Sequence, residues 1–321
     1  MAKSRSFEKL NYAVRANKNV ERKLIVEILK LVGSTDYFRI RDYQYIGFGS
    51  ISFADFSLLH RAIGMTDMTS IEKETTRERR LNFNKPFDCI KLILREYSDA
   101  ITDLNWEKRS FVWLDYDDPL SPAMFSDLKR TLLKVSSGSL VFISANADSY
   151  QLDSRNGDKD PSTPADVLRL VAGQANLPAD SDKRLGRAKF PGLVGDIFAN
   201  AFMNAIFEGR PEVRVIPLMN LTYSDNVPMV TYGGIIVGEV DRIAFETIPG
   251  RDKFSELAGP VQFELSVPNL TAKEKMKFDQ LLPPRNVVPS VAQLGFELKE
   301  KEIESYIKFY LQYPVFGEYQ F

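Results

Sequence analysis

The sequence predicts an α/β protein built on a doubly wound, mostly parallel β-sheet. Over residues 40–145, short apolar segments of strand composition alternate with segments whose apolar residues recur at helical spacing. This alternation is typical of parallel strands joined by crossover helices. Residues 43–72 show the order strand, glycine turn, helix, strand and acid, and residues 213–237 contain two strand-like segments in a row. We therefore expect a parallel sheet that ends in an antiparallel hairpin.

A strand and a glycine turn open the unit at residues 43–72, around which the chain is organised. Aromatic and β-branched residues at 43–48 favour a buried strand. Gly47, Gly49 and Ser50 then predict a tight turn. A glycine has no Cβ, so the backbone of this turn can approach a ligand closely.

The second half of this unit is a helix followed by a strand that ends in an acid. Apolar residues at helical spacing predict a helix at about 52–63, and Gly64 is placed to end it. A second strand at about 67–71 leads directly into Glu72. Together with the glycine turn, this is the first β-α-β unit of a Rossmann-like sheet. Such a unit places a ligand at the helix N-terminus and an acid beside ribose hydroxyls.

Two cofactor families use this layout. A dinucleotide fingerprint requires a third glycine or an alanine, and Ser52 stands in its place. A methyltransferase needs only a glycine turn and a carboxylate at the end of the second strand, which Gly47, Gly49 and Glu72 supply. Tyr45 stands where methyltransferases usually carry a further acid. A strand-to-helix turn that binds no nucleotide is the remaining alternative.

The N-terminal region predicts a basic helical segment. Apolar residues at helical spacing favour a helix at about 18–33, ended by Gly33. Arg15, Lys18 and Arg22 belong to a cation-rich stretch there. Such a stretch is usually a solvated helix face. The alternative is a basic lip over the cofactor or over an anionic substrate, and in that case these three residues contact the substrate.

Further strands and helices follow the first unit in regular order. A third strand is predicted near residues 89–94, after a break at Pro86. Residues 110–117 form a strongly apolar segment that ends in acids, which suits a central parallel strand opening on a ligand crevice. An amphipathic helix at 122–135 and a buried strand at 138–145 complete the series.

Residues 146–192 are polar and irregular, so we expect an insertion that shapes the substrate pocket. A short helix at about 165–172 falls inside it. A helix at 193–208 follows, and strands at 213–223 and 229–237 are separated by a short turn, which predicts the hairpin.

The chain therefore divides into a basic helical segment at 1–39, a Rossmann-like domain at 40–240 and a C-terminal α+β addition at 241–321. The addition contains a predicted strand at 261–267 and a helix at 272–282 with Thr271 as its N-terminal cap. An aromatic-rich helix at 298–313 closes the chain, and its apolar stripe suits a core or a dimer contact.

Composition narrows the class of protein. The chain has 321 residues, a net charge of −1 and 44% hydrophobic residues, as expected for a globular protein with a sizeable core. No apolar segment approaches the roughly 20 residues of a membrane span, and the first residues lack the apolar core of a secretory signal. We expect a cytoplasmic protein with no membrane partner. One cysteine, Cys89, and one histidine, His60, leave little scope for disulfides, zinc or histidine-based catalysis.

Several of these segments resemble a bacterial family of "putative O-methyltransferases". The similarity lies in NYAVRANKNVERK, YIGFGSISFADF, SIEKE, FNKPF and FVWLDYDDPLS, and it covers roughly residues 10–145. It implies a Rossmann-like class I methyltransferase fold and S-adenosylmethionine as cofactor. The segments described above add an N-terminal helix and a helical C-terminal addition to that fold. The implied cofactor-binding residues are Gly47, Phe48, Gly49, Ser50 and Glu72, and the implied catalytic residues are Asp115, Tyr116 and Asp117.

The acidic end of the segment at 110–117 suits methyl transfer. A carboxylate there can accept the proton of the acceptor or orient its hydroxyl or amine. Asp115 and Asp117 alternate along a strand and would share one face. A divalent metal held by oxygen ligands is an alternative use, although we assign no metal ligands. Asp118 with Ser121 instead suits the cap of the next helix.

These observations favour an S-adenosylmethionine-dependent methyltransferase whose acceptor, an O- or N-nucleophile, is unidentified and is anionic or nucleotide-like. A catalytically silent scaffold subunit that binds the cofactor is the first alternative. An NAD-dependent Rossmann oxidoreductase is the second. The aromatic C-terminal helix suits a homodimer or a partner protein.

Overall fold

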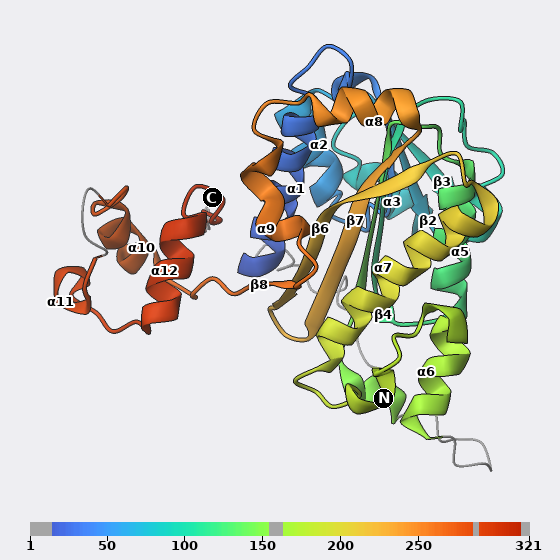
Figure 1. Ribbon diagram of the computed structural model, residues 1–321. Coiled ribbons are helices and arrows are strands. Elements are labelled where there is room, and N and C mark those ends of the chain that lie inside the picture. Colours follow the sequence, from blue (N-terminus) through green and yellow to red (C-terminus); the bar gives the residue numbers. More distant parts are fainter. Residues whose placement is uncertain (1–14, 154–162, 285–288, 316–321) are drawn as a thin grey trace. The chain divides into compact units, whose positions relative to one another are not determined.

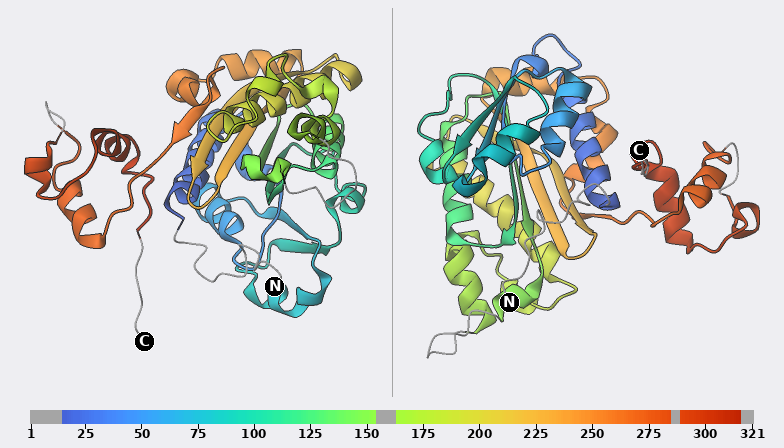
Figure 2. Two further views of the ribbon diagram at one scale, coloured as in Figure 1. Left: turned by 90° about the horizontal axis from the view of Figure 1, so that it is seen from below. Right: turned by 180° about the vertical axis from the view of Figure 1, so that it is seen from behind.

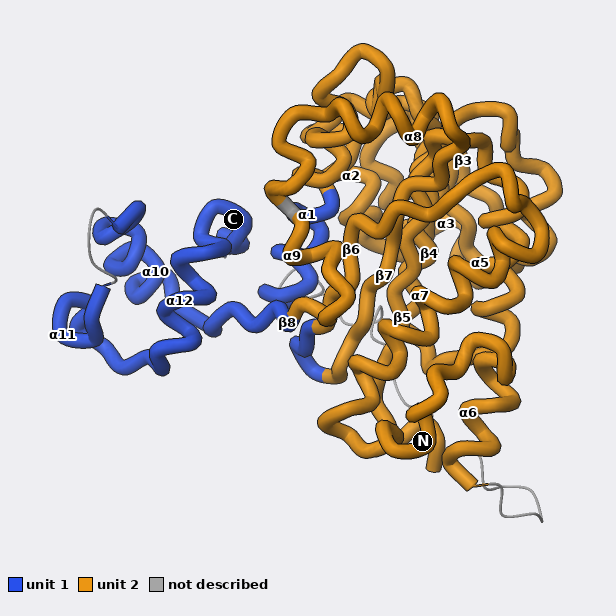
Figure 3. The backbone as a smooth tube through the Cα atoms, in the orientation of Figure 1, with its two compact units in different colours: residues 1–25, 223–226, 264–321 blue, residues 26–222, 227–263 orange. Residues whose placement is uncertain are grey.

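The computed structural model describes residues 15–153, 163–284 and 289–315. They divide into two compact units (Figure 3). The sheet unit contains residues 26–222 and 227–263. The small unit takes in the described residues of 1–25, 223–226 and 264–321.

These units cross the boundaries expected from the sequence. Residues 241–263, expected in the C-terminal addition, belong to the sheet unit. The first turns of the N-terminal helix and the turn at 223–226 instead join the C-terminal residues. Chain order and spatial grouping differ because both ends of the chain contribute to the small unit.

Within the described residues the sheet has eight strands in the order β3-β2-β1-β4-β5-β7-β6-β8. The strands are β1 (Gln44–Gly47), β2 (Asp67–Glu72), β3 (Ile90–Leu94), β4 (Ser110–Pro119), β5 (Ser139–Asn146), β6 (Arg214–Ser224), β7 (Pro228–Val237) and β8 (Phe263–Leu265). Strands β3, β2, β1, β4 and β5 pair in parallel, whereas β7 runs antiparallel to β5. The predicted α/β fold, mostly parallel with an antiparallel strand near its end, is confirmed.

The helices are α1 (Ala16–Val32), α2 (Ala54–Ile63), α3 (Glu78–Asn84), α4 (Tyr97–Ala100), α5 (Pro122–Lys134), α6 (Pro164–Ala172), α7 (Phe190–Gly209), α8 (Glu239–Glu246), α9 (Ser255–Ala258), α10 (Ala272–Asp279), α11 (Val291–Leu294) and α12 (Glu300–Phe309). Helices α5, α6 and α7 lie on one face of the sheet and α2 on the other (Figures 1 and 2). The sheet is therefore covered on both faces, as parallel sheets require.

Each face has its own core. Val112 and Leu114 of β4 belong to the cluster that includes Leu128 of α5 and Phe198 of α7. On the opposite face, the ring of Tyr45 lies 4.7 Å from that of Phe56 in α2. Because successive side chains of a strand point to opposite faces, the two apolar sets alternate along β1 and β4.

Local capping explains several helix ends. Gly64 ends α2 in the left-handed conformation at φ 84°, as its place in the sequence predicts. The Ser121 hydroxyl accepts a hydrogen bond from the Met124 N–H at the start of α5. Thr271 forms a capping box with Glu274 at the start of α10, so its predicted role as a cap is confirmed.

Helix α8 was not expected from the sequence, and its burial is unusual. Its buried residues are Asp241 and Phe245, while Val240 and Ile243 are 71% and 51% exposed. The apolar residues recur at helical spacing, but two of them face away from the buried side of the helix, opposite to the usual relation between apolar spacing and burial.

The aromatic stripe of α12 forms the core of the small unit. The ring of Tyr306 lies 4.5 Å from that of Phe278 in α10 and 5.1 Å from that of Tyr313. Its hydroxyl donates a 2.7 Å hydrogen bond to Asp279. Tyr306 is fully buried, so this part of the stripe serves packing within one chain.

The start of α1 also belongs to the small unit. The Asp225 carboxylate accepts hydrogen bonds of 3.0 Å from the backbone N–H groups of Asn17 and Lys18. Lys18 forms a 2.8 Å ion pair with Glu21 and is 1% exposed, and Arg22 is 5% exposed. The expectation of a solvated helix face is therefore wrong for these two cations.

Helix α7 is the one described helix long and apolar enough, by length and composition, to cross a membrane. Its residues Ile197, Phe198 and Phe202 belong to the core between the helices and the sheet. In this structure α7 therefore serves as a core helix of the sheet unit.

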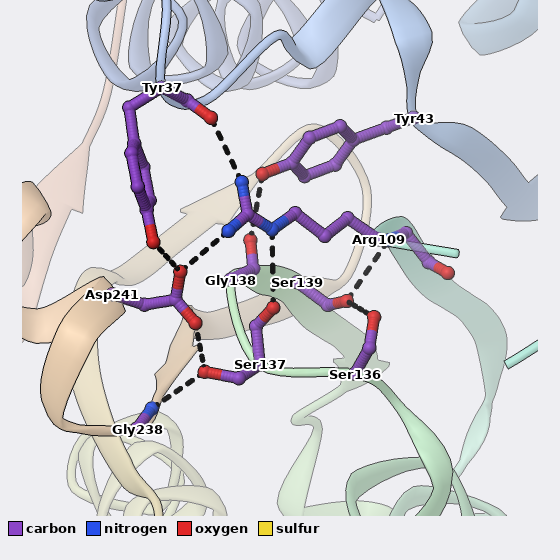
Figure 4. Close-up of polar contacts among 10 residues, drawn as sticks. Tyr37, Tyr43, Arg109, Ser136, Ser137, Gly138, Ser139, Gly238 and Asp241 are labelled. Atoms are coloured by element: carbon purple, nitrogen blue, oxygen red, sulfur yellow. Dashed lines mark hydrogen bonds and ion pairs between the residues drawn. The ribbon is translucent and has the colours of Figure 1, made fainter. Parts of the chain in front are cut away.

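A polar network closes the amino-terminal edge of the sheet (Figure 4). Arg109, just before β4, donates to Asp241 of α8 at 2.6 Å and to the Tyr37 carbonyl oxygen at 2.9 Å. Asp241 also accepts from the hydroxyls of Tyr37 and Ser137. The network ties together segments that are far apart in the sequence, so we assign it to stability.

We expect Arg109→Met to lower the free energy of unfolding by about 2 kcal/mol or more, because it leaves Asp241 without its cation. Urea denaturation followed by tryptophan fluorescence measures this loss. Lys129→Ala, which removes an exposed ion pair with Glu208, is the matched control and is expected to cost about 0.5 kcal/mol or less. Equal effects of the two changes would contradict the assignment.

Candidate active site at the carboxyl edge of the sheet

The candidate site lies where β1, β2 and β4 end. These three strands are adjacent and parallel, so their carboxyl ends meet at one edge of the sheet. Ligands of open α/β sheets bind at this edge. The chain places the glycine turn after β1, Glu72 at the end of β2 and three aspartates at the end of β4.

Hydrogen bonds join the glycine turn to the end of β2. The Ser50 N–H donates a 2.7 Å hydrogen bond to Glu72 Oε1, and the Ser70 hydroxyl donates to the same oxygen at 3.1 Å. The Gly49 N–H donates to the Ser70 hydroxyl at 3.0 Å. The turn and the acid, singled out separately in the sequence, are therefore one structural unit.

Glu72 keeps one oxygen available. In the described part of the chain, no hydrogen bond reaches its Oε2, whereas Oε1 accepts two. Burial raises the pKa of Glu72 above its usual value, and the hydrogen bonds from the Ser50 N–H and the Ser70 hydroxyl oppose that rise. A partly buried carboxylate with an unused oxygen is suited to accept hydrogen bonds from a ligand's hydroxyl groups.

Close packing explains the glycines of the turn. A Cβ on Gly49 would lie 2.6 Å from the Phe53 ring and 2.7 Å from the Ser70 hydroxyl. A Cβ on Gly47 would collide with the Tyr45 hydroxyl. Tyr45, which occupies the position of a further acid in methyltransferases, is 1% exposed and packs in the core. Its hydroxyl approaches the turn from within the protein.

Two residues of the turn adopt left-handed backbone conformations without being glycines. Ser50 has φ 51° and Phe53 has φ 47°. Such conformations cost free energy and are concentrated at functional sites. Phe53 is completely buried, and its ring lies 5.8 Å from that of Phe56, which holds the entry into α2 in place.

The end of β4 separates its polar residues between the two faces of the sheet. Tyr116 points toward α5, where its hydroxyl donates a 2.8 Å hydrogen bond to Asp127. By alternation, Asp115 and Asp117 belong to the opposite face, which Ser70 and Glu72 share. The strand pairing shifts between Asp115 and the last residue of β4, as at a bulge. Bulges next to active sites re-aim side chains.

An aromatic cluster lies behind the turn. The Phe48 ring lies 5.1 Å from that of Tyr116 and 5.9 Å from that of Tyr97, both edge to face. Tyr97 also shares a 2.8 Å hydrogen bond with Thr131 of α5. Burial, together with the neighbouring Asp127, raises the pKa of Tyr116 well above its usual value. Tyr116 therefore stays protonated and anchors the end of β4.

Asp118 lies outside this cluster and is exposed. It forms a 3.3 Å ion pair with Lys73, and the cap of α5 is made by Ser121 instead. Since β1 lies between β2 and β4 in the sheet, the Lys73–Asp118 pair spans the end of β1. Both partners are more than half exposed, so the pair contributes little to stability.

Other polar residues singled out in the sequence are not part of this edge as described. Arg15, Lys18 and Arg22 belong to the small unit. His60 Nδ1 lies 2.8 Å from the Met65 carbonyl oxygen and must donate to it, because a carbonyl only accepts. Cys89 Sγ lies 3.9 Å from the same nitrogen, so His60 cannot deprotonate the thiol there.

Ser70 is a residue of the site that the glycine turn and the strand-end acid do not by themselves indicate. Its position two residues before Glu72 on the same strand puts both side chains on one face, and that alternation was readable from the sequence. The contact of Phe48 with Tyr97 and Tyr116 was not readable, because it depends on the pairing of distant strands. Within the described residues, no group of His, Cys, Asp or Glu side chains is arranged to hold a metal ion.

A family model described as "Putative O-methyltransferase" matches residues 10–321. No curated protein matches the chain.

Solved structures give remote similarity only. An O-methyltransferase TomG from Streptomyces achromogenes in complex with S-adenosylmethionine shares 12% identity, with 72% of this chain and 92% of that chain covered and a TM-score of 0.38. An O-methyltransferase from Klebsiella pneumoniae, described as putative, shares 10% identity over 70% and 81% of the two chains, with a TM-score of 0.40. An O-methyltransferase from Bacillus cereus in complex with S-adenosylhomocysteine shares 13% identity over 68% and 80%, with a TM-score of 0.37.

Proposed function

Because the chain belongs to the family described as "Putative O-methyltransferase", we propose that it transfers a methyl group from S-adenosylmethionine at the carboxyl edge of its sheet. The observation that carries the proposal is Glu72, whose Oε2 is unused while its Oε1 fixes the glycine turn through Ser50. When bound, S-adenosylmethionine supplies an electrophilic methyl group. The turn and the acid fit this cofactor, which has ribose hydroxyls to bind and no pyrophosphate to cradle.

The protein's residues divide the work as follows. Glu72 accepts hydrogen bonds from the ribose hydroxyls, and the backbone of residues 47–50 contacts the methionine side of the cofactor. Phe48 supports the turn by packing on Tyr97 and Tyr116. These roles need no group beyond those already at the edge of the sheet.

The aspartates at the end of β4 act on the acceptor. Asp117 accepts the acceptor's proton as the nucleophile attacks, and Asp115 orients the nucleophile for an in-line approach. Tyr116, expected to be catalytic from the sequence, contributes by holding both aspartates through its hydrogen bond to Asp127.

Several further properties belong to the same proposal. The acceptor is anionic, but Lys18 and Arg22, buried within the small unit, are not available to bind it. The protein works in the cytoplasm of a bacterium without a membrane partner. A homodimer or a partner protein binds at α12, where Leu311, just beyond the helix, is 74% exposed.

Isothermal titration of the full chain with S-adenosylmethionine and S-adenosylhomocysteine tests the proposal. We expect micromolar binding of both, and transfer of label from methyl-labelled S-adenosylmethionine to a component of bacterial extract. Binding without transfer would favour a silent scaffold subunit. No binding, with a nicotinamide cofactor retained on purification, would favour the oxidoreductase.

A further inference from the structure

Helix α3 carries an exposed aromatic ring between two arginines. Phe83 is 87% exposed, the largest exposed fraction among the large hydrophobic residues described. Arg79 and Arg80 precede it by four and three residues, so all three side chains share one helix face. Leu81, on the other side of α3, is buried and anchors the helix to the protein.

The two arginines on this face are available to bind a partner. In the described part of the chain, the side chains of Arg79 and Arg80 form no ion pair or hydrogen bond, and both residues are exposed. Residues 73–85 hold five basic residues and two acidic ones, whereas the chain as a whole has a net charge of −1. Positive charge is therefore concentrated around α3.

Helix α3 begins shortly after the strand that carries Glu72. Helix α3 follows β2 after a short 3-10 turn, Thr75–Arg77, and its first residue, Glu78, comes six positions after Glu72. At 1.5 Å per residue, Phe83 lies roughly 8 Å along the helix from Glu78. A chain molecule bound along α3 can therefore continue to the carboxyl edge of the sheet.

We propose that the face of α3 formed by Arg79, Arg80 and Phe83 binds a single-stranded polynucleotide that brings its methyl-accepting group to the site. Guanidinium groups bind phosphates, and an exposed phenyl ring stacks on a base whatever the sequence. The inference rests on the proposed function, since it names the class of the acceptor.

The pairing of charge with an aromatic ring favours this partner over two others. An acidic protein segment would bind the arginines but would give no reason for an exposed phenyl ring. An anionic membrane would need a wider apolar face, and Phe83 is the one large hydrophobic residue of α3 that is exposed.

Fluorescence anisotropy with the full chain tests the proposal. The probes are a labelled 20-nucleotide RNA of mixed sequence and single-stranded DNA of the same sequence. We expect Arg79→Gln combined with Arg80→Gln to weaken binding roughly tenfold and to lower the salt-dependence slope by about 1.4, because two phosphate contacts are lost. Phe83→Ala should weaken binding roughly tenfold through lost stacking, and Phe83→Trp should retain it.

The matched control removes two exposed cations elsewhere. The variant Lys183→Gln combined with Arg187→Gln has the same net charge as the α3 double variant, but its changes lie in a segment before α7. Its RNA affinity should stay within about twofold of the wild type, because the contacts to RNA are expected at α3. Equal losses in the two double variants would overturn the assignment to α3. So would an absence of RNA and DNA binding by the wild type.

Two further measurements distinguish polynucleotide binding from binding of other polyanions and from binding of the cofactor. The affinity for poly-glutamate and for anionic vesicles is measured in the same way. The polynucleotide proposal would be overturned if either affinity equalled that for RNA and did not change in Phe83→Ala. Titration with S-adenosylmethionine reports separately on the proposed function, because the α3 variants leave Glu72 and the turn unchanged. Polynucleotide binding without cofactor binding would reject the methyltransferase site alone.

Discussion

Glu72→Ala is expected to weaken S-adenosylmethionine binding about 100-fold or more, because charge-assisted hydrogen bonds to two ribose hydroxyls are lost at about 1.5–3 kcal/mol each. The change also deprives the Ser50 N–H and the Ser70 hydroxyl of their shared acceptor. The turn that faces the cofactor therefore loses its link to β2. Isothermal titration of the wild type and the variant measures the loss.

Glu72→Gln is the matched control. Its side-chain oxygen can still accept from Ser50, but the negative charge is gone, so we expect an intermediate loss of about tenfold. Unchanged affinity in the alanine variant would move the cofactor site away from the carboxyl edge of the sheet.

The raised pKa of Glu72 gives this binding a pH dependence. The ionised carboxylate accepts the ribose hydrogen bonds, so affinity is present above the pKa and falls as the pH is lowered through it. Because burial raises that pKa, the loss should begin at a higher pH than an ordinary glutamate would give. In the Glu72→Gln variant this step should be absent from a titration series.

Asp117→Asn is expected to lower the rate of methyl transfer about 10²- to 10⁴-fold while cofactor affinity stays within about twofold, as for loss of a general base. The reason is geometric. By alternation with Tyr116, which points toward Asp127, Asp117 is expected on the face of β4 that Glu72 shares. Formation of S-adenosylhomocysteine with a fixed amount of bacterial extract as acceptor source measures the rate.

Asp118→Asn provides the comparison at the neighbouring position. Asp118 is 65% exposed and pairs with Lys73, so its neutralisation should change the rate by about twofold or less. If Asp118→Asn abolished transfer and Asp117→Asn did not, Asp118 would be the aspartate that faces the site, contrary to the alternation of side chains along β4.

The fold was largely predictable because its signals are local. Gly64, the apolar spacing of α2 and the acid that ends β2 lie within 30 residues and agree with one another. The burial of helix α8 was not predictable, because Asp241 is held by partners distant in the sequence, namely Arg109 and Tyr37.

The sequence predicted which residues form the candidate site better than it predicted the contacts that these residues make. Glu72 and the glycines follow from strand and turn chemistry. The direction of Tyr116 depends on Asp127 in the next helix, and the burial of Lys18 depends on contacts made after folding. Neither periodicity nor composition reports on such long-range contacts.

The left-handed backbone at Ser50 has a consequence for engineering. Glycine adopts φ near 51° without steric cost, so a redesign guided by stability alone would replace Ser50 with glycine. Glycine would also let the unliganded turn sample other conformations, and each excursion would remove the Ser50 N–H from Glu72. At this position, the residue that avoids the backbone strain, glycine, differs from the residue that keeps the unliganded turn bonded to Glu72. The protein has serine, which restricts the turn.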